Sequence, residues 1–224
     1  MMLRRVVVLV AVLAAVACAS SDGRTKAKTA ADRMAKLGEN LTNLDYLIES
    51  TVTSLNALSG NPEGDINAMF DTYLNELSKL ETAAERTRKR AGAVWDQKDE
   101  FLKEWERSLT TIKNEEFRKL SQSRKAEVEE GFVRVKETLD KTKASFDPLL
   151  ANLQDIRTML TTDLNANGVK AIAPIVKDVN EDAAKSRASL VEVKAEFDKL
   201  AMVITPPQQP AEQPTEKTDE QPKP

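Results

Sequence analysis

The sequence contains no histidine and only one cysteine, and each scarcity excludes a class of chemistry. Without histidine the chain lacks the commonest general base and the commonest metal ligand. The Glu-x-x-His motif of helical di-iron proteins is excluded for the same reason. Cys18 has no second cysteine with which to form a disulfide. We therefore expect no enzymatic activity, no catalytic residues, no metal site and no cofactor.

Glycine and aromatic residues are also scarce: there are 7 glycines and 4% aromatics, against 31% charged residues. This balance is typical of helical bundles and coiled coils rather than of sheet proteins. The formal net charge is -3, which does not favour nucleic-acid binding.

The first residues have the features of an export signal. Arg4 and Arg5 form a short basic segment, and Val6–Val16 is an unbroken apolar run. The run is too short for a membrane-spanning helix, which needs about 20 residues. Residues 1–17 are therefore predicted to be a signal peptide.

The residues around the cysteine suggest lipidation. Ala15-Val16-Ala17-Cys18 resembles a bacterial lipobox, in which the cysteine is acylated and becomes the first residue of the mature protein. Ordinary signal cleavage at the same small residues, leaving a secreted protein with a free thiol, is the alternative. We favour lipidation, because a lone cysteine directly after an apolar run has few other roles. Ala19 resembles the sorting pattern for the outer membrane, so we predict an exported protein anchored on the periplasmic side, with the outer membrane favoured.

Apolar residues repeat with alternating steps of three and four along most of the remaining chain. This spacing places them in a narrow seam on each helix, which is the pattern of coiled-coil packing. The predicted fold is all-α: an elongated antiparallel coiled-coil-like helical bundle of three to four long helices over residues 29–204. The helices are expected at about 29–59, 65–113, 121–164 and 168–204.

Polar segments separate the predicted helices. Gly60 is expected to end the first helix, and Asp65 to cap the second. Between the second and third helices the seam is interrupted over residues 114–122, where we expect a bend or a short helical turn and a cap at Ser121 or Ser123.

Two prolines fall within the helical region. The seam continues past Pro148, so we expect a kink there rather than an end. Pro174 could kink the fourth helix or open it after a short turn at 169–173.

Two flanking segments lack large apolar residues. Residues 18–28 are predicted to be the lipidated N-terminus followed by a polar leader. Residues 205–224 are rich in Pro, Gln and Glu, and we expect them to form a disordered tail.

The densest basic cluster is a candidate contact patch: Arg86, Arg88, Lys89 and Arg90. It could bind anionic headgroups or an acidic partner. A solvated helix face balanced by nearby acidic residues explains it as well, and we favour that interpretation.

Three residues on the second seam suggest packing rather than ligand binding. Phe101 and Trp105 lie four apart and are expected to fill the core. Lys98 is a charged residue on the seam, and such a residue often fixes the register of a coiled coil.

The second half of the chain resembles the bacterial lipoprotein family known as domain of unknown function 2959. The matching residues are Trp105, Ile112-Lys113-Asn114, Ser121, Phe132, Phe146-Asp147-Pro148-Leu149-Leu150, Leu160, Leu164-Asn165-Ala166 and Asp178-Val179. Where the family shows Lys-His-Asn before its Leu-Asn-Ala, this chain has Thr161-Thr162-Asp163. The resemblance implies an exported helical protein and supplies no known activity.

Together these features predict a membrane-tethered structural or protein-interaction rod. Its expected partners are the membrane, through the N-terminal lipid, and an unknown envelope protein; a second copy of the chain remains open as a partner. The alternative is a lipid-binding or membrane-remodelling module whose helices open and lay their apolar seams on a bilayer.

Overall fold

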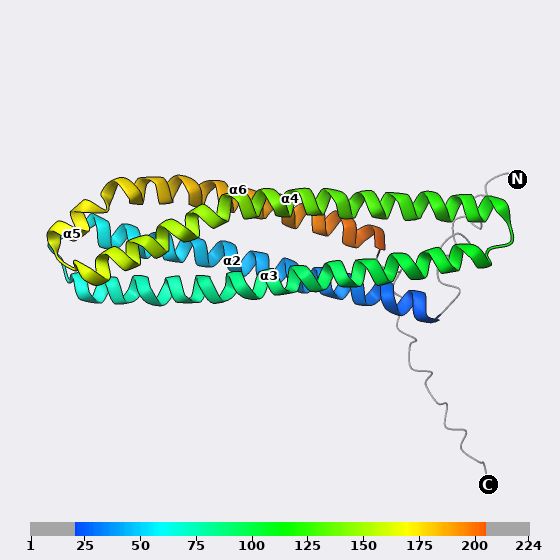
Figure 1. The fold of residues 1–224 in the computed structure, drawn as a ribbon, viewed down its shortest axis with the longest axis horizontal. Coiled ribbons are helices and arrows are strands. Elements are labelled where there is room, and N and C mark those ends of the chain that lie inside the picture. Colours follow the sequence, from blue (N-terminus) through cyan, green and yellow to red (C-terminus); the bar gives the residue numbers. More distant parts are fainter. Residues whose placement is uncertain (1–20, 205–224) are drawn as a thin grey trace, which may run out of the picture.

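The computed structural model describes residues 21–204, which form one elongated bundle of helices (Figure 1). The helices are α2 (Ser21–Gly60), α3 (Ile66–Thr111), α4 (Glu115–Thr162), the short α5 (Ala166–Ala171) and α6 (Ala173–Ile204). Within this part of the chain there is no strand. The predicted all-α class and long packed helices are confirmed.

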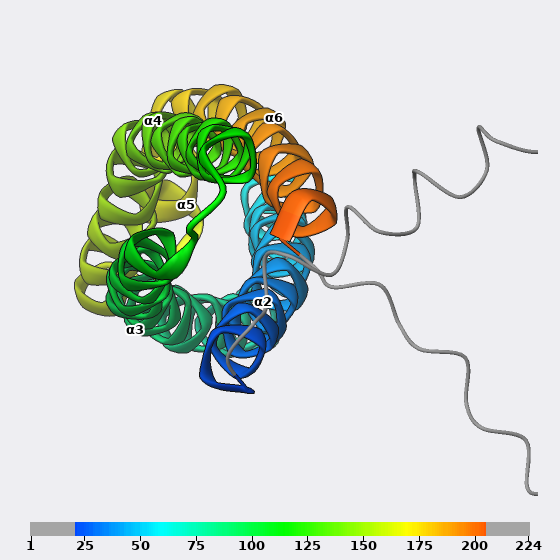
Figure 2. The ribbon, with the colours of Figure 1, turned by 90° about the vertical axis from the view of Figure 1, so that its right-hand side faces the viewer.

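The four long helices form a ring when the bundle is seen end-on (Figure 2). α2 packs against both α3 and α6, and α4 packs against α6, so the helices form a single bundle rather than two separate hairpins. α3 and α4 close the ring, but their backbones approach each other least closely of the four neighbouring pairs.

The apolar seams meet in one continuous core. It extends along α2 from Ala27 and along α6 to Ile204, and includes completely buried leucines such as Leu37, Leu77 and Leu149. Burying one such side chain stabilises the fold by about 1.5–3 kcal/mol. The spacing of three and four residues therefore explains how the helices pack along their length.

The first helix begins earlier than expected. α2 starts at Ser21, so the polar leader predicted up to residue 28 is helical in its described part. Ala27 and Ala30 are 5% and 2% exposed and continue the seam that Met34 was expected to begin. The spacing of large apolar residues does not reveal these two turns, because the seam there is made of alanine.

The third helix also begins before its expected start. Asn114 caps α4: its side-chain oxygen accepts the backbone N–H of Glu116 at 2.9 Å and that of Phe117 at 3.2 Å. The predicted caps Ser121 and Ser123 lie inside the helix, so that prediction was wrong. The seam resumes only later in α4, and the first turns were therefore mistaken for a connection.

At the start of the second helix the expected cap is confirmed. The side chain of Asp65 accepts the backbone N–H of Ala68 at 3.1 Å, directly before α3 begins. This bond satisfies one of the amide groups that the first turn of a helix leaves free.

The two prolines behave differently. α4 continues through Pro148, with Phe146 and Leu149 buried on either side, so the helix does not end there. Pro174 is the second residue of α6, which begins at Ala173 after the short helix α5. It thus opens the helix, where a missing backbone N–H does little harm.

The connection between α4 and α5 requires a glycine. A Cβ atom added to Gly168 would lie 2.0 Å from the carbonyl oxygen of Asp163. The side chain of Asn165 accepts the backbone N–H groups of Asn167 and Gly168, at 2.9 and 3.1 Å. This tight turn lets the chain reverse and return along the bundle as α6.

The two ends of the bundle differ in what they contain. One end holds the turn between α2 and α3 together with α5, whereas the other holds the start of α2, the end of α6 and the turn between α3 and α4 (Figure 1). At this second end the hairpin of α3 and α4 projects beyond the other two helices. We call residues 112–120 the α3–α4 tip.

Candidate functional surfaces

Potential metal-ligating side chains do not cluster in the described helices. Among residues 21–204 no group of three or more Cys, Asp or Glu side chains lies close enough to hold a metal ion. The candidate functional features are therefore surfaces and seams.

No helix within residues 21–204 combines the length and the apolar character needed to cross a bilayer.

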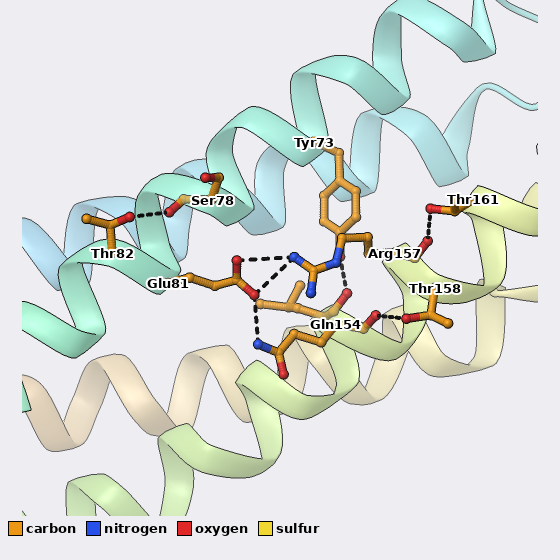
Figure 3. Close-up of polar contacts among 9 residues, drawn as sticks. Tyr73, Ser78, Glu81, Thr82, Gln154, Arg157, Thr158 and Thr161 are labelled. Atoms are coloured by element: carbon orange, nitrogen blue, oxygen red, sulfur yellow. Dashed lines mark hydrogen bonds and ion pairs between the residues drawn. The ribbon is translucent and has the colours of Figure 1, made fainter.

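The interface between α3 and α4 is joined by polar side chains. In Figure 3 the carboxylate of Glu81 on α3 faces Arg157 and Gln154 on α4. It accepts from Nη1 of Arg157, 3.1 Å from each oxygen, and from Nε2 of Gln154 at 2.7 Å. Nearby, the hydroxyl of Tyr73 donates to the carbonyl of Leu153 at 2.5 Å.

Tyr73 is fully buried, and its environment changes its acidity. Burial raises the pKa of its phenol well above the usual value, because the phenolate would lose its hydration. Arg157 lowers this pKa and Glu81 raises it, both by smaller amounts. The phenol is therefore a neutral hydrogen-bond donor rather than a proton-transfer group.

Toward the α3–α4 tip, aromatic side chains join the same two helices. Trp95 meets Phe132 edge-on at a centroid distance of 6.0 Å, and Nε1 of Trp105 donates to Oγ of Ser121 at 3.0 Å. Phe101 is buried and packs on Trp105 at 5.5 Å. These rings fill the space between helices, as the sequence predicted.

The predicted basic patch is divided between different environments. Arg88 forms an ion pair with Asp147 of α4 at 2.9 Å, and Nη1 of Arg90 donates to the carbonyl of Lys36 at 3.5 Å. Arg86 and Lys89 are exposed and form no ion pair with any described residue. Only part of the cluster is thus neutralised by the fold.

Arg86 also lines a shallow groove between α2 and α3. Both polar and apolar side chains line the groove: Asn43, Leu47, Ser78, Lys79, Thr82, Ala83 and Arg86. Lys79 is paired with Glu76 at 2.7 Å, so Arg86 is the cation whose charge is left open to solvent.

Lys98 lies at the edge of the core rather than inside it. Its ammonium lies 3.0 Å from a carboxylate oxygen of the adjacent Asp99, and its side chain is partly exposed. Gln97, only 8% exposed, is the buried neighbour. The proposed effect of Lys98 on register stays a prediction.

The α3–α4 tip carries exposed apolar side chains that the sequence analysis did not single out. Phe117 and Leu120 are 43% and 45% exposed, and Ile112 is partly exposed. The available signal was a pair of apolar residues that do not continue the seam, next to Arg118 and Lys119. It was interpreted only as an interruption of the seam.

The predicted signal and lipidation residues lie outside the part of the chain that the structure describes. They are Ala15, Val16, Ala17 and Cys18. The predicted tail, residues 205–224, lies outside it as well.

Comparison with known proteins places this architecture in a family. No curated protein and no solved structure matches the chain significantly. A family described as a protein of unknown function, DUF2959, matches residues 17–202, so the resemblance expected for the second half extends over most of the sequence. Because the match includes all four long helices almost completely, the chain belongs to the DUF2959 family of proteins of unknown function.

Proposed function

We propose that this protein is a non-enzymatic envelope lipoprotein that acts as a structural or protein-interaction rod. The observation that carries the proposal is the continuous core, which includes residues of all four long helices and both ends of the bundle. Since the apolar seams are used in packing, the exterior that remains for a partner is mainly charged. A rod of this kind separates or connects other components instead of transforming a substrate.

The anchor would be acyl chains on Cys18. This residue lies only three positions before Ser21, where α2 begins, so the anchor would hold the bundle by one of its two ends. The proposed location is the periplasmic face of the cell envelope, with the outer membrane favoured by Ala19.

The anchor is tested by comparing the wild-type protein with the Cys18→Ala variant. We expect the mature wild-type chain to carry the mass of the acyl chains and to sediment with membranes, and the variant to be released in soluble form. A wild-type chain that begins after Ala17 with an unmodified thiol would support simple secretion instead.

For the protein partner, the surface around Arg86 and Lys89 is the best candidate. Both cations are exposed and unpaired among the described residues, which favours an acidic partner. A photocrosslinking amino acid at Lys89 should capture a partner in intact cells, and the additional change Arg86→Glu should abolish the product. The same probe at Val191 on α6, which is 67% exposed, is the matched control.

The alternative function is a lipid-binding or membrane-remodelling module. The observation in its favour is the interface between α3 and α4, where the backbones lie further apart and polar side chains such as Glu81 and Arg157 join the helices. If this interface opened, the apolar seams could reach a bilayer. Flotation with vesicles of a chain that begins near Ala19, and so has neither the apolar signal segment nor Cys18, would support this function over the rod.

A further inference from the structure

The α3–α4 tip combines apolar and basic side chains. Phe117 and Leu120 are three residues apart in the first turns of α4 and are 43% and 45% exposed. Other exposed large apolar residues are scattered over the described helices, as Tyr46, Val133, Met159, Val191 and Met202. Among residues 21–204, only at the tip do two such residues fall within one helical turn.

Charged residues surround these side chains. Lys113 is exposed and forms no ion pair with any described residue. Lys119 lies 3.4 Å from a carboxylate oxygen of Glu115, and Arg118 lies 4.0 Å from the other oxygen. Together with Glu116, the tip has three basic and two acidic side chains. An apolar pair within such a polar setting is suited to the interfacial layer of a bilayer.

The topology brings this tip to the proposed anchor. Nζ of Lys26 lies 3.9 Å from a carboxylate oxygen of Glu104, so the first turns of α2 lie beside the last turns of α3. The start of α2 and the tip are therefore at the same end of the bundle, and the tip projects beyond the start of α2 (Figure 1). α2 begins five residues before Lys26 and α3 ends seven residues after Glu104, so at ~1.5 Å per residue the end of α3 extends ~3 Å past the start of α2 before the tip itself is added.

The distance between the anchor and the helix is short. Ser21 is three positions after Cys18, and a fully extended chain spans at most ~3.6 Å per residue, or about 11 Å. This reach exceeds the ~3 Å by which the end of α3 extends past the start of α2. If acyl chains on Cys18 enter a bilayer, an upright bundle brings the tip to the surface of the same bilayer.

We propose that the α3–α4 tip is a second membrane contact, in which Phe117 and Leu120 enter the interfacial layer and the basic side chains face lipid phosphates. This inference rests on the proposed lipid anchor. The acyl chains retain the protein at the membrane, whereas the tip sets the orientation of the rod. Two partly inserted side chains do not retain the protein alone, so loss of the anchor still releases it.

The test uses the full-length lipidated protein in vesicles of phosphatidylethanolamine and phosphatidylglycerol. Because acylation consumes the thiol of Cys18, the variant Lys113→Cys provides one free thiol for a fluorophore at the tip. We expect nitroxide-bearing lipids to quench this fluorophore several-fold more strongly than one at Tyr46→Cys. Tyr46 is 63% exposed and lies 25 residues along α2 from Ser21, ~37 Å from that end.

A second comparison identifies the responsible side chains. In the Lys113→Cys background, Phe117→Ser with Leu120→Ser should reduce the quenching toward the level at Tyr46, while Val191→Ser should leave it unchanged. Equal quenching at the tip and at Tyr46 would overturn the proposal and would favour a tip that faces water or a protein. Quenching that persists in the double serine variant would also overturn it.

The mass of the mature chain distinguishes an error in the proposed lipid anchor from an error in the proposed tip contact. A chain without acyl groups that does not float with vesicles would overturn the anchor and, with it, the tip contact. An acylated chain whose tip remains unquenched would overturn the tip contact alone.

Discussion

The hydroxyl of Tyr73 on α3 donates a hydrogen bond to the carbonyl of Leu153 on α4, at 2.5 Å. Both residues are completely buried, at the interface where the two helices approach each other least closely. The bond satisfies a phenol that would otherwise be buried without a partner, and it joins helices whose backbones make little direct contact.

Removing this hydroxyl should destabilise the bundle. The variant Tyr73→Phe retains the ring but loses the bond, at an expected loss of about 0.5–1.5 kcal/mol in the free energy of unfolding. Urea denaturation followed by circular dichroism measures it. The control is Tyr46→Phe, whose ring is 63% exposed and whose change should be close to zero. Equal effects of the two variants would contradict the role given to this bond.

The same phenol should make stability depend on pH under alkaline conditions. Burial raises the pKa of Tyr73 in the folded state, whereas the unfolded chain has the usual value near 10. Above about pH 10 the unfolded state therefore binds fewer protons than the folded state, and the free energy of unfolding falls as pH rises. Below about pH 10 the phenol is neutral in both states, so its contribution to the free energy of unfolding does not change with pH.

Lysines also titrate in this range, so the measurement compares two proteins. We expect the free energy of unfolding to decrease more steeply for the wild type than for Tyr73→Phe between about pH 9 and 11. The difference in free energy of unfolding between the wild type and Tyr73→Phe should therefore become smaller as the pH rises. A difference that is independent of pH would show that the Tyr73 phenol ionises equally in both states.

The helical cap at Asn114 can be tested against the cap that the sequence suggested. Asn114→Ala removes the acceptor for two backbone N–H groups and should reduce the free energy of unfolding by about 0.5–2 kcal/mol. Ser123 is exposed within α4, so Ser123→Ala should change it by less than about 0.5 kcal/mol. Chemical denaturation of the two variants decides which residue caps the helix.

How much could be predicted depended on the size of the side chains in the seam. Large residues such as Leu77 and Leu149 revealed the helices and their coiled-coil-like packing, because their spacing is visible in any window. Ala27 and Ala30 pack equally well but resemble surface alanines in a sequence. The first turns of α4 were missed for the opposite reason: Phe117 and Leu120 are apolar but do not contribute to the core.

The polar contacts were harder to predict than the helices. Arg88 and its neighbours were recognised as a cluster, but its partner Asp147 is 59 residues away and only the packing of α3 on α4 brings the two together. The prediction of lipidation at Cys18, in contrast, rests on neighbouring residues in the sequence alone and stays a prediction.

Two glycines should respond in opposite ways to substitution by alanine. At Gly168 the added Cβ would collide with the backbone of Asp163, and we expect the free energy of unfolding to fall by about 1–3 kcal/mol. At Gly92, which is exposed within α3, nothing lies within 4 Å of the added atom. There alanine restricts the unfolded chain, so we expect the free energy of unfolding to rise by about 0.5–1 kcal/mol. Thermal unfolding monitored at 222 nm measures both, and effects of the same sign would contradict the close approach at Gly168.

Locking α3 to α4 distinguishes a rigid rod from a module that opens. Arg88 and Asp147 form an exposed ion pair across this interface at 2.9 Å, so Arg88→Cys with Asp147→Cys can be joined by a short thiol crosslinker. If the protein acts as a rod, the joined protein should remain in the membrane fraction and retain the partner captured at Lys89. If the helices must open onto a bilayer, the crosslink should abolish vesicle deformation, and cleaving it should restore that activity. Single-cysteine variants treated with the same reagent are the control for loss of the ion pair without a crosslink. Because the pair is exposed, its loss should lower the free energy of unfolding by at most about 1 kcal/mol.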